Sequence, residues 1–557
     1  MLFPPDPSDI LRRIPLSART VLDVGCGAVR FAAAYRALNP RARMLGLAVD
    51  QATAAAAAPH LDQVVRTDLA GEALPFAVPD GIDCIVYNEI LEHVADPWAL
   101  LRRHADALSP DGMMLICVRN AEYWRLADRL LRGGVPDEPA DEIPMGGFSL
   151  ATVQAKLSDA GLTVCDVTPR QPDGPQAAKF AASLALGLEA LGVDPRDYAQ
   201  RATPSHLIWR VRRDPCQRMM LSGNMLNPVG GVSHVRVVYP IEAMATDPTV
   251  IAAVTDRVEI GAPDNGMARI FVLHRPALIG QQGHALLRGL TDAGFLIVTE
   301  FDDLPDHFDM MRMGGDLGFR GVHALQTSTV TMADAIRQYN PEIAVFPNAI
   351  GSLPEIRNFT DLKAVTVFFG ALNREQDWLP IMPAINAVAA MAGPRLRFQV
   401  VHDQAFFDAL ATPHKVFTPT CDHETYLRIL GESEISLMPL ADTRFNRAKS
   451  DLKFIEAGAC RVASLASSVV YANSIEDGRT GLLFRDPVEF HARLLHLLAM
   501  PELARELGDT ARRYVSAERM LAYQVAARIA WYRSLWARRE ALSEARRQRM
   551  LRYRVAA

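Results

Sequence analysis

Two lysines and a glutamate near the end of the chain have the types and spacing of an anion-binding site. Lys449 and Lys453 are four residues apart in a segment with helical character, and Glu456 follows one turn later. On one helix the two ammonium groups would share a face near the N-terminal half, where backbone N–H groups and the helix dipole also attract phosphate. The segment therefore predicts a diphosphate cradle that includes Ser450, with Glu456 placed to accept hydrogen bonds from ribose hydroxyls.

Acidic residues gather at the end of a predicted strand in the middle of the chain. Glu300, Asp302 and Asp303 follow an apolar run, and in open α/β sheets the carboxyl ends of the strands line the ligand crevice. These carboxylates could orient or deprotonate a hydroxyl group. They would also suit Mg²⁺ or Mn²⁺ beside a diphosphate, but we expect the metal-free arrangement. His274, at another strand end, is a further catalytic candidate, and a buried structural role for it is as good an interpretation.

A second ligand signature lies near the N-terminus. Asp23, Gly25 and Gly27 stand in the sequence Val-Leu-Asp-Val-Gly-Cys-Gly, which reads as a strand followed by a tight turn into a helix. Glycine allows such a turn and lets the backbone approach a ligand at the start of the helix. The chain therefore predicts two ligand sites of different chemistry.

The elements that position these residues follow one pattern. Short apolar runs alternate with longer helical segments, which predicts α/β folding with parallel sheets covered by helices. We expect three doubly wound, Rossmann-like sheets in succession. The expected units are a first domain over 1–170, a helical connector over 171–216, domains over 217–350 and 351–520, and a basic C-terminal helix over 521–557.

Bulk properties agree with several globular domains. The chain has 557 residues, of which 49% are hydrophobic and 22% charged, and its net charge of −5 gives no reason to expect nucleic acid as a partner. The seven cysteines show no Cys-x-x-Cys pair, so we expect neither a disulfide framework nor a zinc site, and a reducing cytoplasm fits best. No apolar run is long enough to span a membrane.

The C-terminal segment is basic. Nine arginines and two glutamates lie between Arg528 and Arg554. A run of this kind could contact an anionic membrane surface or a polyanionic acceptor. A solvated helix end is the simpler interpretation.

The first third resembles the class I S-adenosylmethionine-dependent methyltransferases over about residues 10 to 170. The glycine turn carries the resemblance, together with an acid that ends a third strand and the sequence Asn-Glu-Ile-Leu-Glu-His after a fourth. It implies that Asp23, Gly25 and Gly27 line the methionine and ribose part of the cofactor. It also implies that Asp68 faces the adenine and that Asn88 lies beside the reaction centre.

Two positions depart from that family. Val29 stands where a small residue is usual, and Ala48 stands where an acid usually binds the ribose hydroxyls. Asp50 is the nearest replacement for that acid. Losing a carboxylate contact removes about 1.5–3 kcal/mol for each charged hydrogen bond. The alternatives are therefore a working methyltransferase and a methyltransferase fold retained as a binding module.

The remainder, about residues 217 to 535, resembles GT-B-fold glycosyltransferases of the group related to sucrose and glycogen synthases. The resemblance rests on the Lys449–Gly458 segment and the preceding strand, on the glycine loop at Gly230 and Gly231, and on Gly370 after a strand. It implies that the glycines and lysines bind a nucleotide-sugar donor and that Glu456 binds its ribose.

Two departures leave the donor sugar open. Ala448 replaces a usual second glutamate eight residues before Glu456, and Arg374 is the nearest substitute for a usual arginine and lysine pair after Gly370. The resemblance favours a reaction that retains the anomeric configuration.

These observations predict a cytoplasmic enzyme, peripheral at the inner membrane if the basic segment binds lipid. It would transfer sugar from a UDP-, GDP- or dTDP-sugar to a saccharide or glycoconjugate, with Asp302, Asp303, His274 and Lys453 as catalytic candidates. The first domain would use S-adenosylmethionine to methylate the same glycan, as suits the synthesis of a bacterial surface polysaccharide. The alternatives are a glycosyltransferase with an inactive methyltransferase-like module and a scaffold without activity.

Overall fold

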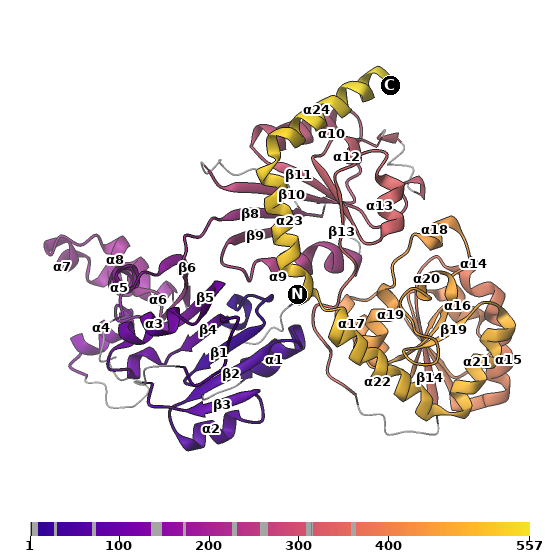
Figure 1. Ribbon diagram of the computed structural model, residues 1–557, viewed down its shortest axis with the longest axis horizontal. Helices are drawn as coiled ribbons and strands as arrows, with labels where there is room; N and C mark the ends of the chain where they lie inside the picture. The colour runs from indigo at the N-terminus through magenta and orange to yellow at the C-terminus, as the bar shows by residue number, and fades with distance from the viewer. Residues whose placement is uncertain are drawn as a thin grey trace.

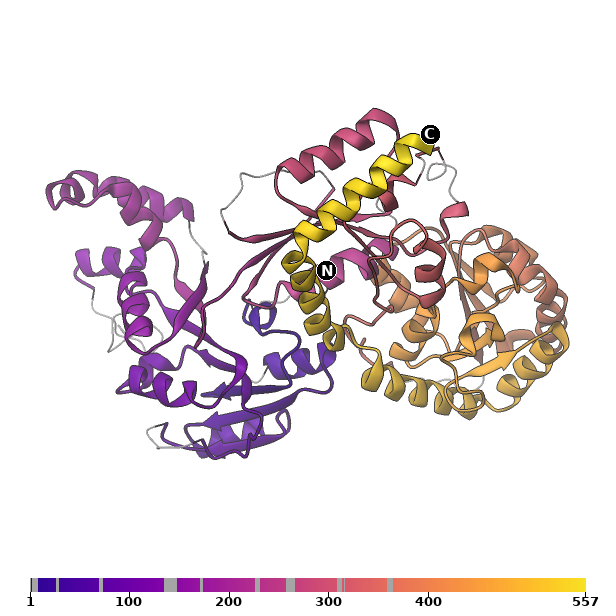
Figure 2. The same ribbon diagram turned by 45° about the horizontal axis from the view of Figure 1, so that its top comes forward.

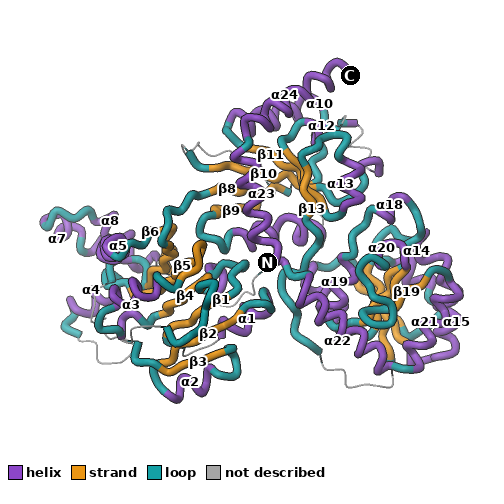
Figure 3. The backbone as a smooth tube through the Cα atoms, viewed as in Figure 1, coloured by secondary structure: helices purple, strands orange, loops and turns teal. Residues whose placement is uncertain are grey.

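The fold was analysed in a computed structural model of the whole chain. It describes residue 2 and residues 9–26, 30–69, 74–134, 148–170, 174–225, 231–256, 266–307, 313–314, 316–357 and 364–556. Three sheets covered by helices form three lobes, which confirms the predicted α/β class (Figures 1 and 3). No described helix has the length and apolar character needed to cross a bilayer.

The first sheet has seven strands in the order β3-β2-β1-β4-β5-β7-β6. Its strands are β1 (Thr20–Val24), β2 (Arg43–Ala48), β3 (Gln63–Arg66), β4 (Ile82–Asn88), β5 (Leu108–Arg119), β6 (Thr163–Arg170) and β7 (His206–Arg212). Its helices are α1 (Arg30–Leu38), α2 (Gln51–Ala57), α3 (Pro97–Ala105), α4 (Trp124–Leu131), α5 (Leu150–Asp159), α6 (Gly174–Ser183), α7 (Ala185–Ala190) and α8 (Pro195–Ala202).

The expected connector over 171–216 is only partly helical. After α6, α7 and α8 the chain enters β7, which pairs antiparallel with both β5 and β6 inside the first sheet. The first sheet therefore extends to Arg212. The cysteine expectation also differs, because Cys165 of β6 forms a disulfide with Cys216 just after β7, with their Cα atoms 5.7 Å apart. The two cysteines are 51 positions apart in the sequence, so no short Cys-x-x-Cys spacing marks them as a pair.

The second sheet has six parallel strands in the order β13-β12-β11-β10-β8-β9. Its strands are β8 (Met219–Asn224), β9 (Val250–Thr255), β10 (Ala268–His274), β11 (Leu296–Glu300), β12 (Ala324–Thr327) and β13 (Ile343–Val345). Its helices are α9 (Tyr239–Met244), α10 (Gly280–Asp292), α12 (Leu317–Arg320) and α13 (Val330–Ile336), and a π-helical turn, His234–Val238, precedes α9.

The third sheet has six parallel strands in the order β16-β15-β14-β17-β18-β19. Its strands are β14 (Val365–Gly370), β15 (Leu396–Val401), β16 (Lys415–Thr418), β17 (Ile435–Met438), β18 (Ala463–Ser467) and β19 (Leu482–Phe484). Its helices are α14 (Glu375–Trp378), α15 (Met382–Ala392), α16 (Gln404–Ala409), α17 (His423–Gly431), α18 (Arg444–Arg447), α19 (Leu452–Ala459), α20 (Ser468–Tyr471), α21 (Pro487–Ala499) and α22 (Pro501–Glu518). The strand order reverses between β14 and β17, which is where doubly wound sheets bind ligands.

The C-terminal helices leave the third lobe and return to the second. Helices α23 (Val525–Ala537) and α24 (Arg539–Ala556) run across the second lobe (Figures 1 and 2). Val525, Ile529 and Tyr532 of α23 are buried in one apolar cluster with residues of the first and second sheets, so one face of this helix packs on the body of the protein. The expected basic helix is α24, and its Arg546 and Arg549 donate hydrogen bonds to backbone carbonyls of residues 320–322.

Candidate active sites

A cavity of about 490 Å³ lies between the carboxyl edges of the second and third sheets. The second lobe contributes loop ends after β10 and β11 and the turn before α9. The third lobe contributes the ends of β14 and β17 and the start of α19. The polar side chains in its wall are Arg236, Arg275, Asp302, Asp303, Asn348, Asn373, Arg374, Lys449, Ser450, Lys453 and Tyr471. The cavity therefore collects most of the candidates from the last two domains in one place.

The two lysines reach this cavity, but not from one helix face as expected. Helix α19 begins only at Leu452, with Asp451 at its N-cap position. The Asp451 carboxylate accepts two hydrogen bonds from Arg519, at 2.6 and 2.8 Å. This ion pair holds the preceding residues in a loop, so Lys449 approaches from the loop and Lys453 from the first turn of α19.

The lysine environments differ in their partners. Lys453 donates a hydrogen bond to the carbonyl of Gly370, and burial lowers the pKa of Lys453 to about 8, helped by the positive charges of Arg374 and Lys449 and opposed by Glu456. Lys449 Nζ lies 2.7 Å from Asp303 Oδ1, an ion pair that joins the two lobes. Burial lowers the pKa of Lys449, although Asp303 opposes this shift.

The three acidic residues at the end of β11 differ in their partners and in their access to the cavity. Asp302 and Asp303 line the cavity, and Asp302 Oδ1 accepts a hydrogen bond from Arg275 Nε at 2.7 Å. Burial acts to raise the pKa of Asp302, but Arg275 outweighs it and the net shift is downward. Glu300 is fully buried and paired with Arg236. Both aspartates therefore lie in the wall of the cavity, whereas Glu300 does not.

His274 is fully buried at the end of β10. Its Nδ1 lies 3.5 Å from Ser233 Oγ and its Nε2 lies 3.9 Å from Asp302 Oδ1. Burial lowers the pKa of His274 to about 4, against the attraction of Asp302. Its Nε2 is buried and makes no hydrogen bond to a described residue, and the described wall of the cavity does not include His274.

Glu456 pairs within the third lobe with His423, and His423 in turn contacts the second lobe. Its Oε1 lies 2.9 Å from His423 Nε2, and His423 Nδ1 lies 3.2 Å from the Tyr239 hydroxyl. Burial acts to lower the pKa of His423, but the hydrogen bond and charge of Glu456 outweigh it and raise the pKa overall. Gly231 adjoins this group with φ +74°, and a Cβ there would lie 3.9 Å from the His423 ring. Gly230 lies outside the described residues.

Gly370 and Arg374 follow β14 as expected. A Cβ on Gly370 would lie 2.6 Å from the rings of Phe368 and Tyr426, so only glycine fits there. Arg374 Nη1 lies 3.0 Å from Asn446 Oδ1 and 3.3 Å from Asp377 Oδ2. These partners hold the Arg374 guanidinium at the wall of the cavity.

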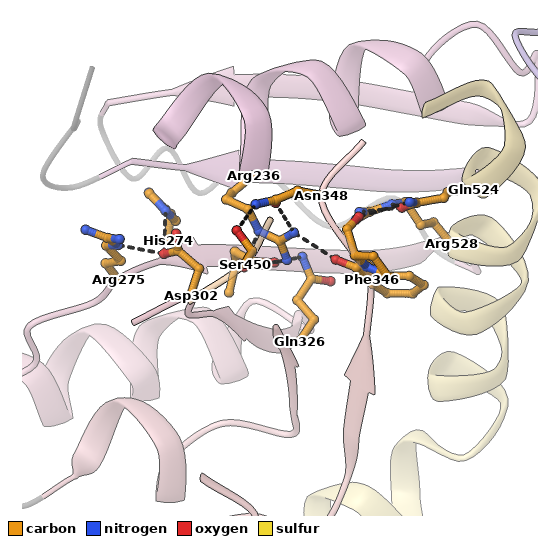
Figure 4. Close-up of polar contacts among 12 residues, drawn as sticks. Arg236, His274, Arg275, Asp302, Gln326, Phe346, Asn348, Ser450, Gln524 and Arg528 are labelled. Carbon is orange, nitrogen blue, oxygen red and sulfur yellow. Dashed lines mark hydrogen bonds and ion pairs between the residues drawn. The ribbon is translucent and has the colours of Figure 1, made fainter. Parts of the chain in front are cut away.

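Sequence reasoning missed one central residue, Arg236. Its side chain contacts Asn348 and the carbonyl of Phe346, and Asn348 contacts Ser450 of the third lobe (Figure 4). The Arg275–Asp302 pair lies to one side of it. Arg236 stands alone in an otherwise apolar and neutral stretch after the glycine loop, and that isolation is the one sequence signal that marks it.

The first lobe has its own cavity, of about 650 Å³, at the carboxyl ends of β2, β3 and β4. Its wall includes Val49, Asp68, Ile90, His93 and Arg103. This volume suits a nucleoside-sized ligand. Asp68 therefore lies in the wall of a cavity, and its role toward an adenine ring stays a prediction.

The glycine turn lies beside this cavity and is tightly packed. Gly25 has φ +81°, and a Cβ on it would lie 2.6 Å from Ile90. Asp23 is 5% exposed, and burial raises the pKa of Asp23 to about 7. A cationic amino group bound nearby would stabilise the charged carboxylate. Gly27 lies outside the described residues.

Asp50 caps α2. Its carboxylate accepts hydrogen bonds from Thr53 N at 2.8 Å and from Thr53 Oγ1 at 2.7 Å, and these hydrogen bonds lower the pKa of Asp50. The strand end that would carry a ribose-binding acid is the buried Ala48. Asn88 is exposed at the end of β4, as expected.

Comparisons with known proteins match these two sites separately. A family model described as a methyltransferase domain matches residues 4–167, and a model described as glycosyl transferase-like matches residues 383–530. A ubiquinone biosynthesis O-methyltransferase of Xanthomonas campestris is 31% identical over 114 residues, which cover 20% of this chain and 47% of that protein. The chain thus spans about half the length of the curated relatives it matches.

Solved structures show weaker likenesses. Sucrose-phosphate synthase of Thermosynechococcus elongatus is 14% identical, with 57% of this chain and 100% of that chain covered and a TM-score of 0.42. Anabaena HepE in complex with UDP-glucose is 12% identical, with 56% and 100% covered and a TM-score of 0.41. On the two family models, the chain carries a methyltransferase domain at its N-terminal end fused to a glycosyltransferase domain toward its C-terminal end.

Proposed function

We propose that the interlobe cavity transfers a sugar from a nucleotide-sugar donor to a saccharide or glycoconjugate acceptor. The observation that carries this proposal is the meeting of Lys449, Lys453 and Arg374 in one cavity with Asp302 and Asp303 on the opposite wall. Cations there would match a diphosphate, and acids there would match hydroxyl groups of the acceptor.

The proposed chemistry is displacement of a diphosphate leaving group. As the bond from the anomeric carbon to the diphosphate oxygen breaks, negative charge grows on that oxygen, and Lys449, Lys453 and Arg374 would stabilise it. The acceptor oxygen forms the new bond to the anomeric carbon, and Asp302 or Asp303 would orient its hydroxyl and accept its proton. We propose retention of the anomeric configuration, which NMR of the product would test.

The Glu456–His423 pair of the third lobe is the proposed ribose contact. Glu456 keeps a second carboxylate oxygen that could accept from a ribose hydroxyl while Oε1 stays with His423. Gly231, Gly370 and Ser450 would allow close approach of the donor. The described residues include no group of three or more metal-ligating side chains, and we propose transfer without a metal ion.

A panel of UDP-, GDP- and dTDP-sugars tests this function. Purified full-length protein should release free nucleotide from at least one donor, in the presence of EDTA as well as Mg²⁺. Lys453→Ala should abolish most of that release. Absence of release from every donor, with and without oligosaccharide acceptors, would contradict the proposal.

We further propose that the first domain binds S-adenosylmethionine. Its residues fit in part: Asp23 would pair with the cofactor's amino group, Asp68 would face the adenine, and Asn88 would lie at the mouth where an acceptor enters. Asp50 is engaged with Thr53 and is not part of this proposal. When bound, the cofactor would supply an electrophilic methyl group. Methylation of the same glycan is the proposed role.

Titration with S-adenosylmethionine and with its demethylated product separates the alternatives. Binding in this assay and nucleotide release in the other support a bifunctional enzyme. Nucleotide release without cofactor binding supports a glycosyltransferase with a methyltransferase-like binding module. Absence of both cofactor binding and nucleotide release supports a scaffold without activity.

We propose that α24 contacts an anionic membrane surface. Arg546 and Arg549 are held by backbone carbonyls of the second lobe, while Arg539 and Arg547 are more exposed. Sedimentation with vesicles that contain phosphatidylserine tests it, with neutral phosphatidylcholine vesicles as the control.

A further inference from the structure

Arg236 lies at the centre of the contact between the second and third lobes. Its side chain is 2% exposed yet forms part of the cavity wall. It belongs to the π-helical turn His234–Val238, and such turns are rare and are frequently found at functional sites. Pro240, in the first turn of α9, has no N–H, so the usual helical bond to the Arg236 carbonyl cannot form.

The contacts on the sheet side fix the plane of the guanidinium. Arg236 Nε and Nη2 donate to the two carboxylate oxygens of Glu300, at 2.9 and 3.0 Å. Gln326 Nε2 donates to the same carboxylate at 2.8 Å, and the Tyr532 hydroxyl of α23 donates to Gln326 at 2.7 Å. A bidentate pair that is itself supported by further hydrogen bonds leaves the guanidinium one orientation.

The contacts on the cavity side extend to the third lobe. Arg236 Nη1 donates to the Phe346 carbonyl and to Asn348 Oδ1, each at 2.8 Å. Because Asn348 Oδ1 accepts from Arg236, its amide nitrogen is turned toward Ser450, and Nδ2 donates to Ser450 Oγ at 2.7 Å. Figure 4 shows this sequence of contacts. Ser450 is the neighbour of Lys449 in the chain.

A gain in folding stability does not by itself explain the buried Arg236–Glu300 pair. A buried ion pair must overcome a large loss of hydration, and apolar side chains of similar volume often replace such pairs without loss of stability. Apolar side chains cannot, however, orient the amide of Asn348. The distinctive effect of Arg236 is therefore the position that it gives to Asn348 and, through it, to Ser450 and Lys449.

We propose that Arg236 is a positioning residue for the sugar transfer proposed above: through Asn348 and Ser450 it holds Lys449 where the departing diphosphate develops its charge. An interaction that matters only in the transition state lowers kcat and leaves KM nearly unchanged. This inference rests on the proposed function, and it assigns a role to a residue that does not itself touch the reacting atoms.

Arg236→Lys and Asn348→Ala test this role in the full-length protein. Both should lower kcat for nucleotide release by about tenfold and change KM for the donor by less than about threefold. Combining Arg236→Lys with Ser450→Ala should be no worse than Arg236→Lys alone, because the two residues act through one contact. Asn386→Ala is the control, since the Asn386 side chain also makes two hydrogen bonds, in this case with backbone groups and far from the cavity.

Amide hydrogen exchange gives a readout that needs no turnover. The Lys449 amide donates to the Asn446 carbonyl at 3.0 Å, and exchange across residues 446–453 should accelerate in Arg236→Lys and Asn348→Ala but not in Asn386→Ala. Unchanged exchange in this loop, or additive effects in the double variant, would overturn the positioning role. Absence of wild-type turnover would refute sugar transfer, and the exchange result would still decide whether Arg236 holds the loop.

Discussion

Asp303 and Lys449 pair across the cleft where a donor diphosphate is proposed to bind. Their side chains are 13% and 21% exposed, and their charged atoms lie 2.7 Å apart. A diphosphate must therefore displace Asp303 from Lys449 before it can use that charge. In the free protein Asp303 competes with the donor, and once displaced it is available to an acceptor hydroxyl.

Removing this competitor should strengthen binding of the product nucleotide. Asp303→Asn should bind UDP, or whichever diphosphate the protein prefers, about three- to tenfold more tightly, because a negative charge near the ligand is lost. Isothermal titration measures this. Asp306→Asn is the control, since Asp306 pairs with Arg444 across the same lobes at a more exposed position. Weaker binding in Asp303→Asn would indicate that Asp303 binds the ligand, directly or through a metal ion.

The buried Lys453 makes nucleotide binding depend on pH. The pKa of Lys453 is lowered to about 8 from the ordinary 10.5, so the ammonium is charged below that pH and becomes neutral above it. Affinity for a nucleoside diphosphate should fall by up to about tenfold per pH unit above pH 8. Lys453→Arg keeps its charge at these pH values, so its binding curve should be much flatter. A wild-type affinity that is constant from pH 7 to 9.5 would rule out this role.

At the level of single residues, the sequence predicted which side chains line the cavity but not which residues they contact. Lys453, Arg374, Asp302 and Asp303 follow strand ends, and strand ends converge in parallel sheets, so their meeting could be predicted. The ion pair between Asp451 and Arg519 joins residues far apart in the chain. It starts α19 later than its helical pattern indicates, and no local pattern could show it.

At the level of elements, the strands with the weakest sequence signal lie at the edges of the sheets. β9, β16 and β6 are at the edges of their sheets, and many of their side chains are exposed or half-buried. Edge strands need no continuous apolar run, so the signal that revealed the central strands is absent. β7 lies inside its sheet, between β5 and β6. It runs antiparallel to both strands, and a regular alternation of parallel strands and helices does not predict such a strand.

Helix α2 and strand β3 supply a direct test of the cofactor site. Asp50→Ala removes the cap of α2 and should leave the affinity for S-adenosylmethionine within about twofold of wild type, because a capping carboxylate has its acceptors occupied. Asp68→Asn should weaken binding about tenfold, as expected for loss of a charged hydrogen bond. Fluorescence or calorimetric titration measures both. A larger loss in Asp50→Ala than in Asp68→Asn would show that Asp50 reaches the ribose after all.

At the level of the whole molecule, the first lobe shares a core with the rest. One cluster of buried residues includes Ile10 and Tyr35 of the first lobe, Ile241 of α9 and Ile529 of α23. The backbone N–H of Leu16 also donates to Thr246 at 2.8 Å. The first and second lobes are therefore expected to unfold together.

Calorimetry of the full chain and of a chain that begins at residue 213 tests this shared core. The full chain should show one transition for the first two lobes, and the truncated chain should lose stability and aggregate because it exposes α9 and α23. A chain that carries Ile241→Asp should resemble the truncated one, whereas Ile251→Asp, at an exposed position on β9, should not. Independent melting of the first lobe at an unchanged temperature would contradict the prediction.

The return of α23 and α24 to the second lobe means that this lobe is completed by helices that follow the third lobe in the sequence. During synthesis on the ribosome, the first and third lobes are complete before α23 is made. Until then, the surface of the second lobe that packs against α23 is exposed to solvent. That surface is apolar, and exposed apolar surface in a partly made chain invites chaperones or aggregation. Nonsense mutations that remove only these last helices should thus be as damaging to the yield of folded protein as much larger deletions.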